Sequence, residues 1–208
     1  IPARAPEKQS PVRVELHLTT EQQAATRAMD ENCIRDVNLY LYGDTEYHFY
    51  FPSVSSPLVF NVLPGNYRSY AIANAGQDLG DKNAFKIQFY ETAVDVMESS
   101  DAIPMTDRGT LAVDGAGRCT PSSLRVTRSA AKIAYTIEVA DAVAPSLRLR
   151  SVQFCNLPLT IRPFDSGSIS STVEANYYDG EAMPVGNERR TAGTAYLFEN
   201  LQGSVDTI

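Results

Sequence analysis

The fold is decided by the stretch Val12-Arg13-Val14-Glu15-Leu16-His17-Leu18-Thr19. Apolar and polar side chains alternate strictly along it. Because successive side chains of a β-strand point to opposite faces, this period predicts a strand with one buried and one exposed face. The buried face is expected to consist of Val12, Val14, Leu16 and Leu18. Residues 1–11, which hold three prolines, are expected to form a flexible leader before this strand.

The alternation returns beyond this first strand. Strand patterns cover residues 34–42, 47–51, 58–63, 67–73, 124–139 and 147–157. In the last of these the apolar phase slips between Leu149 and Val152, which predicts a β-bulge near Ser151. Turn signals such as Pro64-Gly65-Asn66 separate the strands. About seven strands of this kind predict a mainly β protein, an all-β sandwich.

Two regions depart from the strand pattern. Phe85, Phe89 and Tyr90 recur at helix-like spacing, so one short helix is expected over residues 83–96. Residues 98–123 are expected to be irregular, since they include the glycine-rich run 114–117.

The strand patterns also predict the domains. Residues 1–163 are expected to form one N-terminal β-sandwich domain. Residues 164–208 carry too few strong strand patterns to make a domain alone. They are expected to be the beginning of a second β domain, which this sequence truncates.

Composition limits the classes of function. The 208 residues carry a net charge of −7. An acidic surface repels phosphate groups, so no nucleic-acid partner is expected, and docking on anionic lipid is disfavoured as well. No apolar run reaches the roughly 20 residues that span a bilayer. No signal peptide is recognisable, so an exported protein would be present here in its mature form.

The residues that usually carry chemistry are few. The two histidines, His17 and His48, lie in no metal-binding spacing and are expected to be surface or packing residues. The sequence contains no nucleophile elbow, phosphate-binding loop or dinucleotide motif. We therefore predict no catalytic residue, no metal site and no cofactor, and we expect that the protein is not an enzyme. Acidic pairs at turns leave weak calcium binding open as an alternative, and these pairs are Asp44 with Glu46 and Asp78 with Asp81.

The cysteines predict no disulfide framework. Cys33, Cys119 and Cys155 are odd in number and form no CxxC motif, which argues against zinc and redox sites. Cys155 lies in an apolar run and is expected to be a buried free thiol.

The abundance of tyrosine leaves two readings open. Tyr40, Tyr42, Tyr47 and Tyr50 could form a stacking platform for glycans, or they could pack across neighbouring strands. The first reading gives an alternative function, a monomeric surface lipoprotein that binds glycans or host proteins.

Several segments in order along the chain resemble one family. They are Val37–Tyr42, Leu63–Tyr67, Ala71–Asn74, Ile103–Thr106, Arg128–Ile133, Asn156–Pro158 and Phe198–Gly203. Together these segments resemble the fimbrillins, the type V pilins, across most of the chain. The resemblance implies a secreted lipoprotein precursor with two transthyretin-like Greek-key β-sandwich domains. In related proteins more chain follows the segment that resembles Phe198–Gly203. This sequence ends five residues after it, which implies a truncated second domain.

The resemblance also implies a mechanism of assembly. In that family an arginine-specific surface protease removes the first strand, and a donor strand from the next subunit fills the groove. The implied partners are other pilin subunits, the protease and a host or bacterial surface receptor. The implied location is the cell surface, in a fimbrium at the outer membrane. Contact with the membrane is implied only through a lipid anchor on the precursor.

Carried onto this sequence, the mechanism assigns roles to particular residues. The removable strand is 12–19, and the cleavage loop is 20–33. The bond between Arg27 and Ala28 is the expected cleavage site, because Arg27 precedes a small residue in a polar loop. Arg35 is expected to belong already to the second strand, where a protease cannot reach the backbone. The alternative is that 12–19 is an ordinary N-terminal strand.

Overall fold

A computed structural model describes residues 9–20, 33–93, 102–143, 146–164 and 177–198. Internal contacts divide the chain into two compact units. The first unit comprises residues 1–90 and 95–128, and the second comprises 91–94 and 129–208. None of the described segments is a helix of the length and apolar character needed to cross a membrane.

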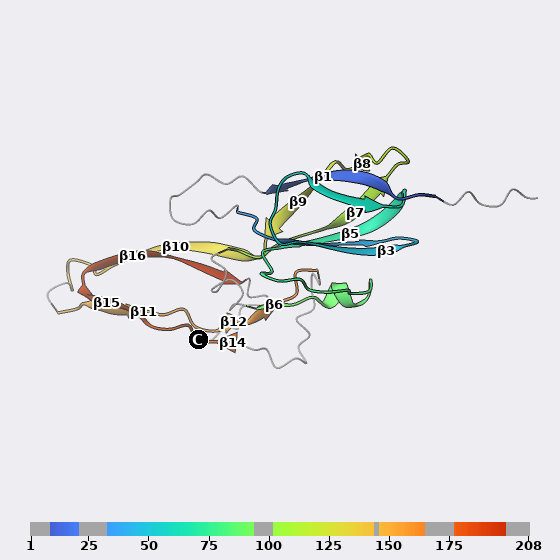
Figure 1. Cartoon of the computed structure of the whole chain (residues 1–208). Helices are drawn as coiled ribbons and strands as arrows, with labels where there is room; N and C mark the ends of the chain where they lie inside the picture. Colours follow the sequence, from blue (N-terminus) through green and yellow to red (C-terminus); the bar gives the residue numbers. More distant parts are fainter. Residues whose placement is uncertain (1–8, 21–32, 94–101, 144–145, 165–176, 199–208) are drawn as a thin grey trace, which may run out of the picture. The chain divides into compact units, whose positions relative to one another are not determined.

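The first unit is a β-sandwich of two layers (Figure 1). Its strands are β1 (Val12–Thr20), β2 (Val37–Tyr42), β3 (Glu46–Phe51), β4 (Leu58–Val62), β5 (Gly65–Ala73), β7 (Met105–Val113), β8 (Cys119–Thr120) and β9 (Ser123–Arg128). One layer has the order β3-β2-β5-β7, and the other has the order β4-β1-β9. The layers join where Met105 and Thr106 pair with Arg128 and Thr127. The mainly β sandwich predicted from the sequence is confirmed.

The core of the first unit lies between these layers. The alternation of each strand sends every second side chain inward, where it joins one apolar cluster. The fully buried members include Val14, Leu16, Leu39, Leu41, Ala71, Leu111 and Val126. Strand β2 differs from its neighbours because all six of its residues are buried. Its outer face must therefore be covered as well.

The expected helix over 83–96 is wrong in its length. The structure has one 3₁₀ turn, η1 (Lys86–Phe89), followed by the short strand β6 (Thr92–Ala93). The side chain of Asn83 accepts hydrogen bonds from the backbone N–H groups of Phe85 (3.2 Å) and Lys86 (2.8 Å) and so starts the turn. Tyr90 has extended backbone angles, which end it. Residues 94–96 lie outside the described part of the chain.

The expectation that 98–123 is irregular is also wrong, because β7 and β8 lie within it. Strand β7 was not recognised from the sequence because its middle residues Asp107, Arg108 and Gly109 are not apolar. Those residues lie where β7 is the last strand of its layer. A strand at the edge of a sheet buries less surface, and so its apolar alternation is weaker.

The second unit consists of pairs of strands. Its elements are β6, β10 (Ala130–Glu138), β11 (Leu149–Val152), β12 (Leu157–Pro158), β13 (Thr160–Ile161), β14 (Tyr177–Tyr178), β15 (Met183–Glu188) and β16 (Arg190–Phe198). β10 pairs with β16, β11 with β15, β12 with β14 and β13 with β6, all antiparallel. The register of β11 shifts between Leu149 and Ser151, as the bulge near Ser151 requires.

The structure places the boundary between the units at Arg128 and Ser129, whereas the sequence analysis placed it after residue 163. The pattern 124–139 is two strands, β9 and β10, that belong to different units. β10 pairs along its whole length with β16, which lies some 60 residues later, and this pairing assigns it to the second unit. The apolar side chains change from even positions (Leu124 and Val126) to odd positions (Ile133 and Ile137) across this boundary, a change of phase that the sequence analysis did not use.

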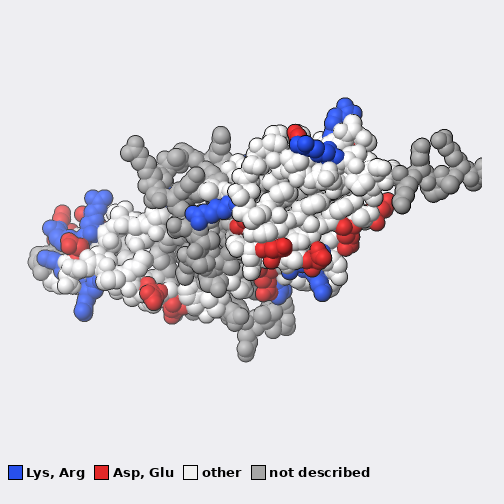
Figure 2. Space-filling model, in the orientation of Figure 1, with Lys and Arg blue, Asp and Glu red and all other residues white. Residues whose placement is uncertain are grey.

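All three cysteines are free thiols. Cys155 is exposed, so the prediction that it is buried is wrong. After the bulge, Val152 and Phe154 are partly buried while Gln153 and Cys155 are exposed, so the alternation turns Cys155 outward. Figure 2 shows acidic and basic side chains scattered over the visible face, in several places next to one another.

Candidate functional site

The candidate site is the position of β1 within its layer. β1 lies between β4 and β9 and pairs with both. Its first half, Val12–Leu16, pairs antiparallel with β4. Its second half, His17–Thr20, pairs parallel with β9. The two halves of one strand are thus held from opposite sides.

The inner face of β1 belongs to the core. Val14 and Leu16 are fully buried, and Val12 and Leu18 are partly buried against the same apolar cluster. Burial of the first two side chains stabilises this arrangement by roughly 3–6 kcal/mol, at about 1.5–3 each. The outer face is polar, and Arg13 forms an exposed ion pair with Glu15 at 3.1 Å.

The second half of β1 is fixed by further contacts on its β9 side. The backbone N–H of His17 donates to the carbonyl of Ser122 (3.1 Å), and the hydroxyl of Thr19 donates to the carbonyl of Leu124 (3.3 Å). These bonds continue the ladder that starts at His17.

The first half of β1 has a different neighbour on that side, the turn between β7 and β8. We call residues 114–118 the gate turn. Asp114 holds this turn together, because its carboxylate accepts hydrogen bonds from the N–H groups of Ala116 and Arg118, both at 2.9 Å. The guanidinium of Arg118 lies 2.7 Å from the same carboxylate. The N–H and the guanidinium of Arg118 hold the pKa of Asp114 below its ordinary value.

Sequence reasoning missed this turn, although its signal was present. The run Asp114-Gly115-Ala116-Gly117 has the composition of a turn between two strands. It could not be placed beside β1, because β7 and β8 were not recognised.

The expected cleavage site cannot be compared with the structure. Arg27 and Ala28 lie in 21–32, outside the described residues. Arg35 was expected within the second strand, but β2 begins only at Val37 and Arg35 is exposed. Its backbone N–H is nevertheless fixed, since it donates to the side chain of Asn74 at 2.8 Å.

Of the two readings of the tyrosines, the stacking platform does not form at Tyr40 and Tyr42. Tyr40 and Tyr42 lie on the outer face of β2, where the segment 74–90 covers them and leaves them 0% and 4% exposed. Their hydroxyls donate to the carbonyls of Gly80 and Lys82 at 2.8 and 2.5 Å, and burial raises the pKa of both phenols. Tyr47 packs on the opposite face of the sheet, against the core. Packing therefore explains these tyrosines, and they do not form one accessible surface.

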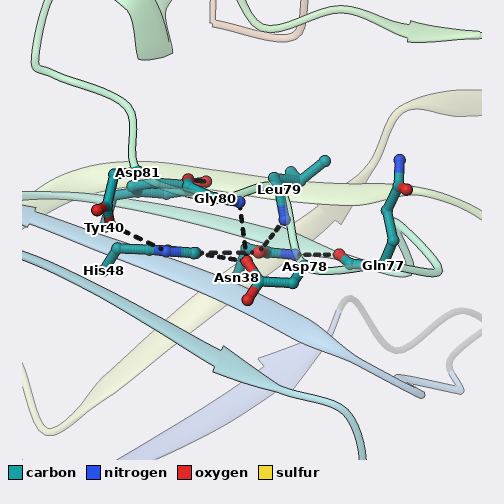
Figure 3. A network of polar contacts seen from close by, with 8 residues as sticks. All are labelled: Asn38, Tyr40, His48, Gln77, Asp78, Leu79, Gly80 and Asp81. Atoms are coloured by element: carbon teal, nitrogen blue, oxygen red, sulfur yellow. Dashed lines mark hydrogen bonds and ion pairs between the residues drawn. The ribbon is translucent and has the colours of Figure 1, made fainter.

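A polar network fastens the covering segment to the sheet (Figure 3). Asn38 accepts a hydrogen bond from the N–H of Leu79 (3.0 Å) and donates one to the carbonyl of Gln77 (3.0 Å). The ring of His48 stacks on Tyr40 with centroids 4.3 Å apart, and its Nε2 lies 3.1 Å from Asn38 Oδ1. His48 is thus a packing residue, as expected. Asp78 and Asp81 approach it at 3.7 and 3.6 Å.

Neither a protein-family model nor a curated protein matches this sequence. Solved structures do match its fold. A putative cell adhesion protein from Parabacteroides distasonis matches with a TM-score of 0.65 at 8% identity, over 95% of this chain and 73% of that one. A fimbrilin from Porphyromonas gingivalis matches with a TM-score of 0.63 at 13% identity, over 93% of this chain and 68% of that one.

The fold is that of the fimbrillins. A fimbrial assembly protein from Parabacteroides distasonis shares it, with a TM-score of 0.53 at 13% identity over 92% of this chain and 77% of that one. The fimbrillin fold extends through both units, because each match covers more than nine tenths of the chain. At these identities the likeness concerns the fold alone.

Proposed function

We propose that this protein is a structural subunit of a cell-surface pilus and not an enzyme. The observation that carries the proposal is the position of β1 between β4 and β9. Loss of an edge strand would expose one neighbour, but loss of this strand would unpair backbone groups on both. The resulting slot has an apolar floor and two strand edges, which are the features that bind an added strand.

In this proposal β1 is a plug. Cleavage between Arg27 and Ala28 releases it, and a strand from a neighbouring subunit then takes its place and makes the polymer grow. The partners are other copies or other pilins, an arginine-specific protease and a surface receptor. A lipid anchor on the precursor would hold the protein at the outer membrane until it assembles. Solved structures of the same fold named as fimbrial and adhesion proteins support this role.

The plug mechanism is tested by limited proteolysis of the folded protein with an arginine-specific protease. N-terminal sequencing and a native gel identify the cut and the assembly state. We expect one rapid cut with a new terminus at Ala28, loss of residues 1–27 and growth of oligomers. If the cut leaves β1 bound and the protein monomeric, the alternative of a monomeric surface-binding protein becomes the better one.

Two variants control this experiment. Arg27→Lys keeps the positive charge but removes the recognised residue, so it should resist cleavage and stay monomeric. Arg35→Lys is the matched control, and it should be cut and should assemble like the unchanged protein. Unchanged cleavage of Arg27→Lys at the same bond would reject this bond as the arginine-specific site.

A further inference from the structure

The gate turn touches the main chain of β1. Pairing of β1 with β9 begins only at His17, so β9 does not pair with Arg13. The gate turn is the neighbour of Arg13 in its place. A Cβ atom placed on Gly117 would lie 2.1 Å from the carbonyl oxygen of Arg13 and 3.2 Å from its carbonyl carbon. The same atom would lie 3.8 Å from the Cβ of Val12. Only a residue without a side chain allows this approach.

The gate turn is not free to withdraw. Its backbone closes on itself through Asp114 N–H to Arg118 carbonyl (3.1 Å) and Gly117 N–H to Asp114 carbonyl (3.0 Å). The pairing of Val113 with Cys119 anchors both of its ends. Gly117 also has a φ of +80°, a conformation that few residues other than glycine adopt easily.

We propose that the gate turn is the second wall of the strand slot and selects what occupies it. Gly117 forms a seat for the backbone carbonyl at the position of Arg13, whichever chain supplies that carbonyl. The seat admits a flat, extended strand and holds its first half against β4, while β9 holds the second half. If a strand of a second copy occupies the slot, the inference rests on the proposed function. If β1 occupies the slot, the inference is independent of the proposed function.

The seat recognises backbone and not side chain, because the atoms that it meets at position 13 are carbonyl atoms. Strands of different sequence can therefore use it. A bulge or a turn at that position would move the carbonyl away from Gly117. The partner that fits is an extended strand with apolar residues at the positions of Val12, Val14, Leu16 and Leu18.

Hydrogen exchange of the full, uncleaved chain, followed by mass spectrometry, tests the seat. In Gly117→Ala we expect exchange in 12–16 to rise about tenfold or more, because the added methyl group displaces this half of β1. Exchange in 37–42 should stay unchanged. Gly115→Ala is the matched control in the same turn, since a Cβ there meets nothing within 4 Å, and it should leave 12–16 unchanged.

Backbone strain at residue 117 is separated from collision by Gly117→Asn. Asparagine tolerates a positive φ better than alanine but still carries a Cβ atom. We expect the same rise in 12–16 for both Gly117 variants. If neither folds, Asp114→Ala replaces them, because it loosens the gate turn without adding an atom near β1, and exchange in 12–16 should again rise. Unchanged exchange in 12–16, or an equal rise in Gly115→Ala, would overturn the proposal.

Assembly after cleavage gives a second readout. We expect the Gly117 variants to assemble at least about tenfold more slowly than Gly115→Ala, because their Cβ occupies the place of the incoming carbonyl. Equal assembly rates of the Gly117 variants and Gly115→Ala would show that Gly117 does not select the strand of a second copy. Failure of the unchanged protein to assemble would count against the proposed function, while the exchange measurement would still decide whether the gate turn holds β1.

Discussion

The hydroxyl of Tyr40 donates a hydrogen bond to the carbonyl oxygen of Gly80 at 2.8 Å. This bond joins the outer face of β2 to the segment that covers it. Loss of the hydroxyl removes this part-buried hydrogen bond, so we expect Tyr40→Phe to lower the free energy of unfolding by about 1 kcal/mol. Urea unfolding measures this change.

Tyr50→Phe is the matched control for that variant. Tyr50 lies on the neighbouring strand β3 opposite Asn38, and within the described part of the chain its hydroxyl makes no hydrogen bond. We expect a change within about 0.5 kcal/mol. Equal losses in both variants would mean that the bond to Gly80 does not fasten the covering segment.

The inner face of β1 should contribute most of the stability of that strand. Leu16→Ala removes a fully buried side chain from the core and should cost about 2–5 kcal/mol in urea unfolding. Glu15→Ala, on the exposed face next to it, should change stability by less than about 0.5 kcal/mol. A small effect of Leu16→Ala would show that β1 does not depend on its apolar face.

Asn74 connects three segments and is fully buried. Its side chain donates to the carbonyls of Cys33 (2.9 Å) and Ile103 (2.8 Å) and accepts from the N–H of Arg35. Its φ is 62°. Asn74→Ala leaves these groups unpaired and adds backbone strain, so we expect a loss of at least about 3 kcal/mol by urea unfolding.

Asn187→Ala isolates the contribution of the backbone angle. Asn187 has a nearly equal φ of 65° but is exposed. We expect a loss of only about 1 kcal/mol there. Similar losses at both positions would mean that the hydrogen bonds of Asn74 add little.

Asp107 should make stability depend on pH. Burial raises its pKa above the ordinary value of 3.8, although the N–H groups of Arg108 and Arg125 oppose the shift. The folded state then holds this proton more tightly than the unfolded state, so the contribution of Asp107 to stability falls as pH rises from 3.8 through the raised pKa. Asp107→Asn should remove this fall. Urea unfolding at about pH 4 and about pH 7 compares the two proteins, and parallel pH profiles would contradict the prediction.

The strand patterns predicted from the sequence depend on local information. Period-2 alternation shows in a single segment, so β1 and β4 were recognised with nearly the bounds they have, and the bulge near Ser151 appeared as a phase slip. Strand β7 was missed, because Asp107 and Gly109 lie at a sheet edge where burial does not demand apolar side chains. The length of the helix was overestimated from the helix-like spacing of Phe85 and Phe89. These side chains contact each other but remain 69% and 46% exposed, so they do not anchor a helix in the core.

The sequence by itself determined that the chain is mainly β and that Val12, Val14, Leu16 and Leu18 share one face of its first strand. Only the tertiary structure decided that β1 lies between β4 and β9, that the chain from Ser129 onward belongs to the second unit, and that Gly117 lies against Arg13. Side-chain alternation can be recognised in each segment alone, because it follows from the geometry of a single strand. Strand partners are separated by many residues, and which of them meet depends on how all the apolar faces are buried together.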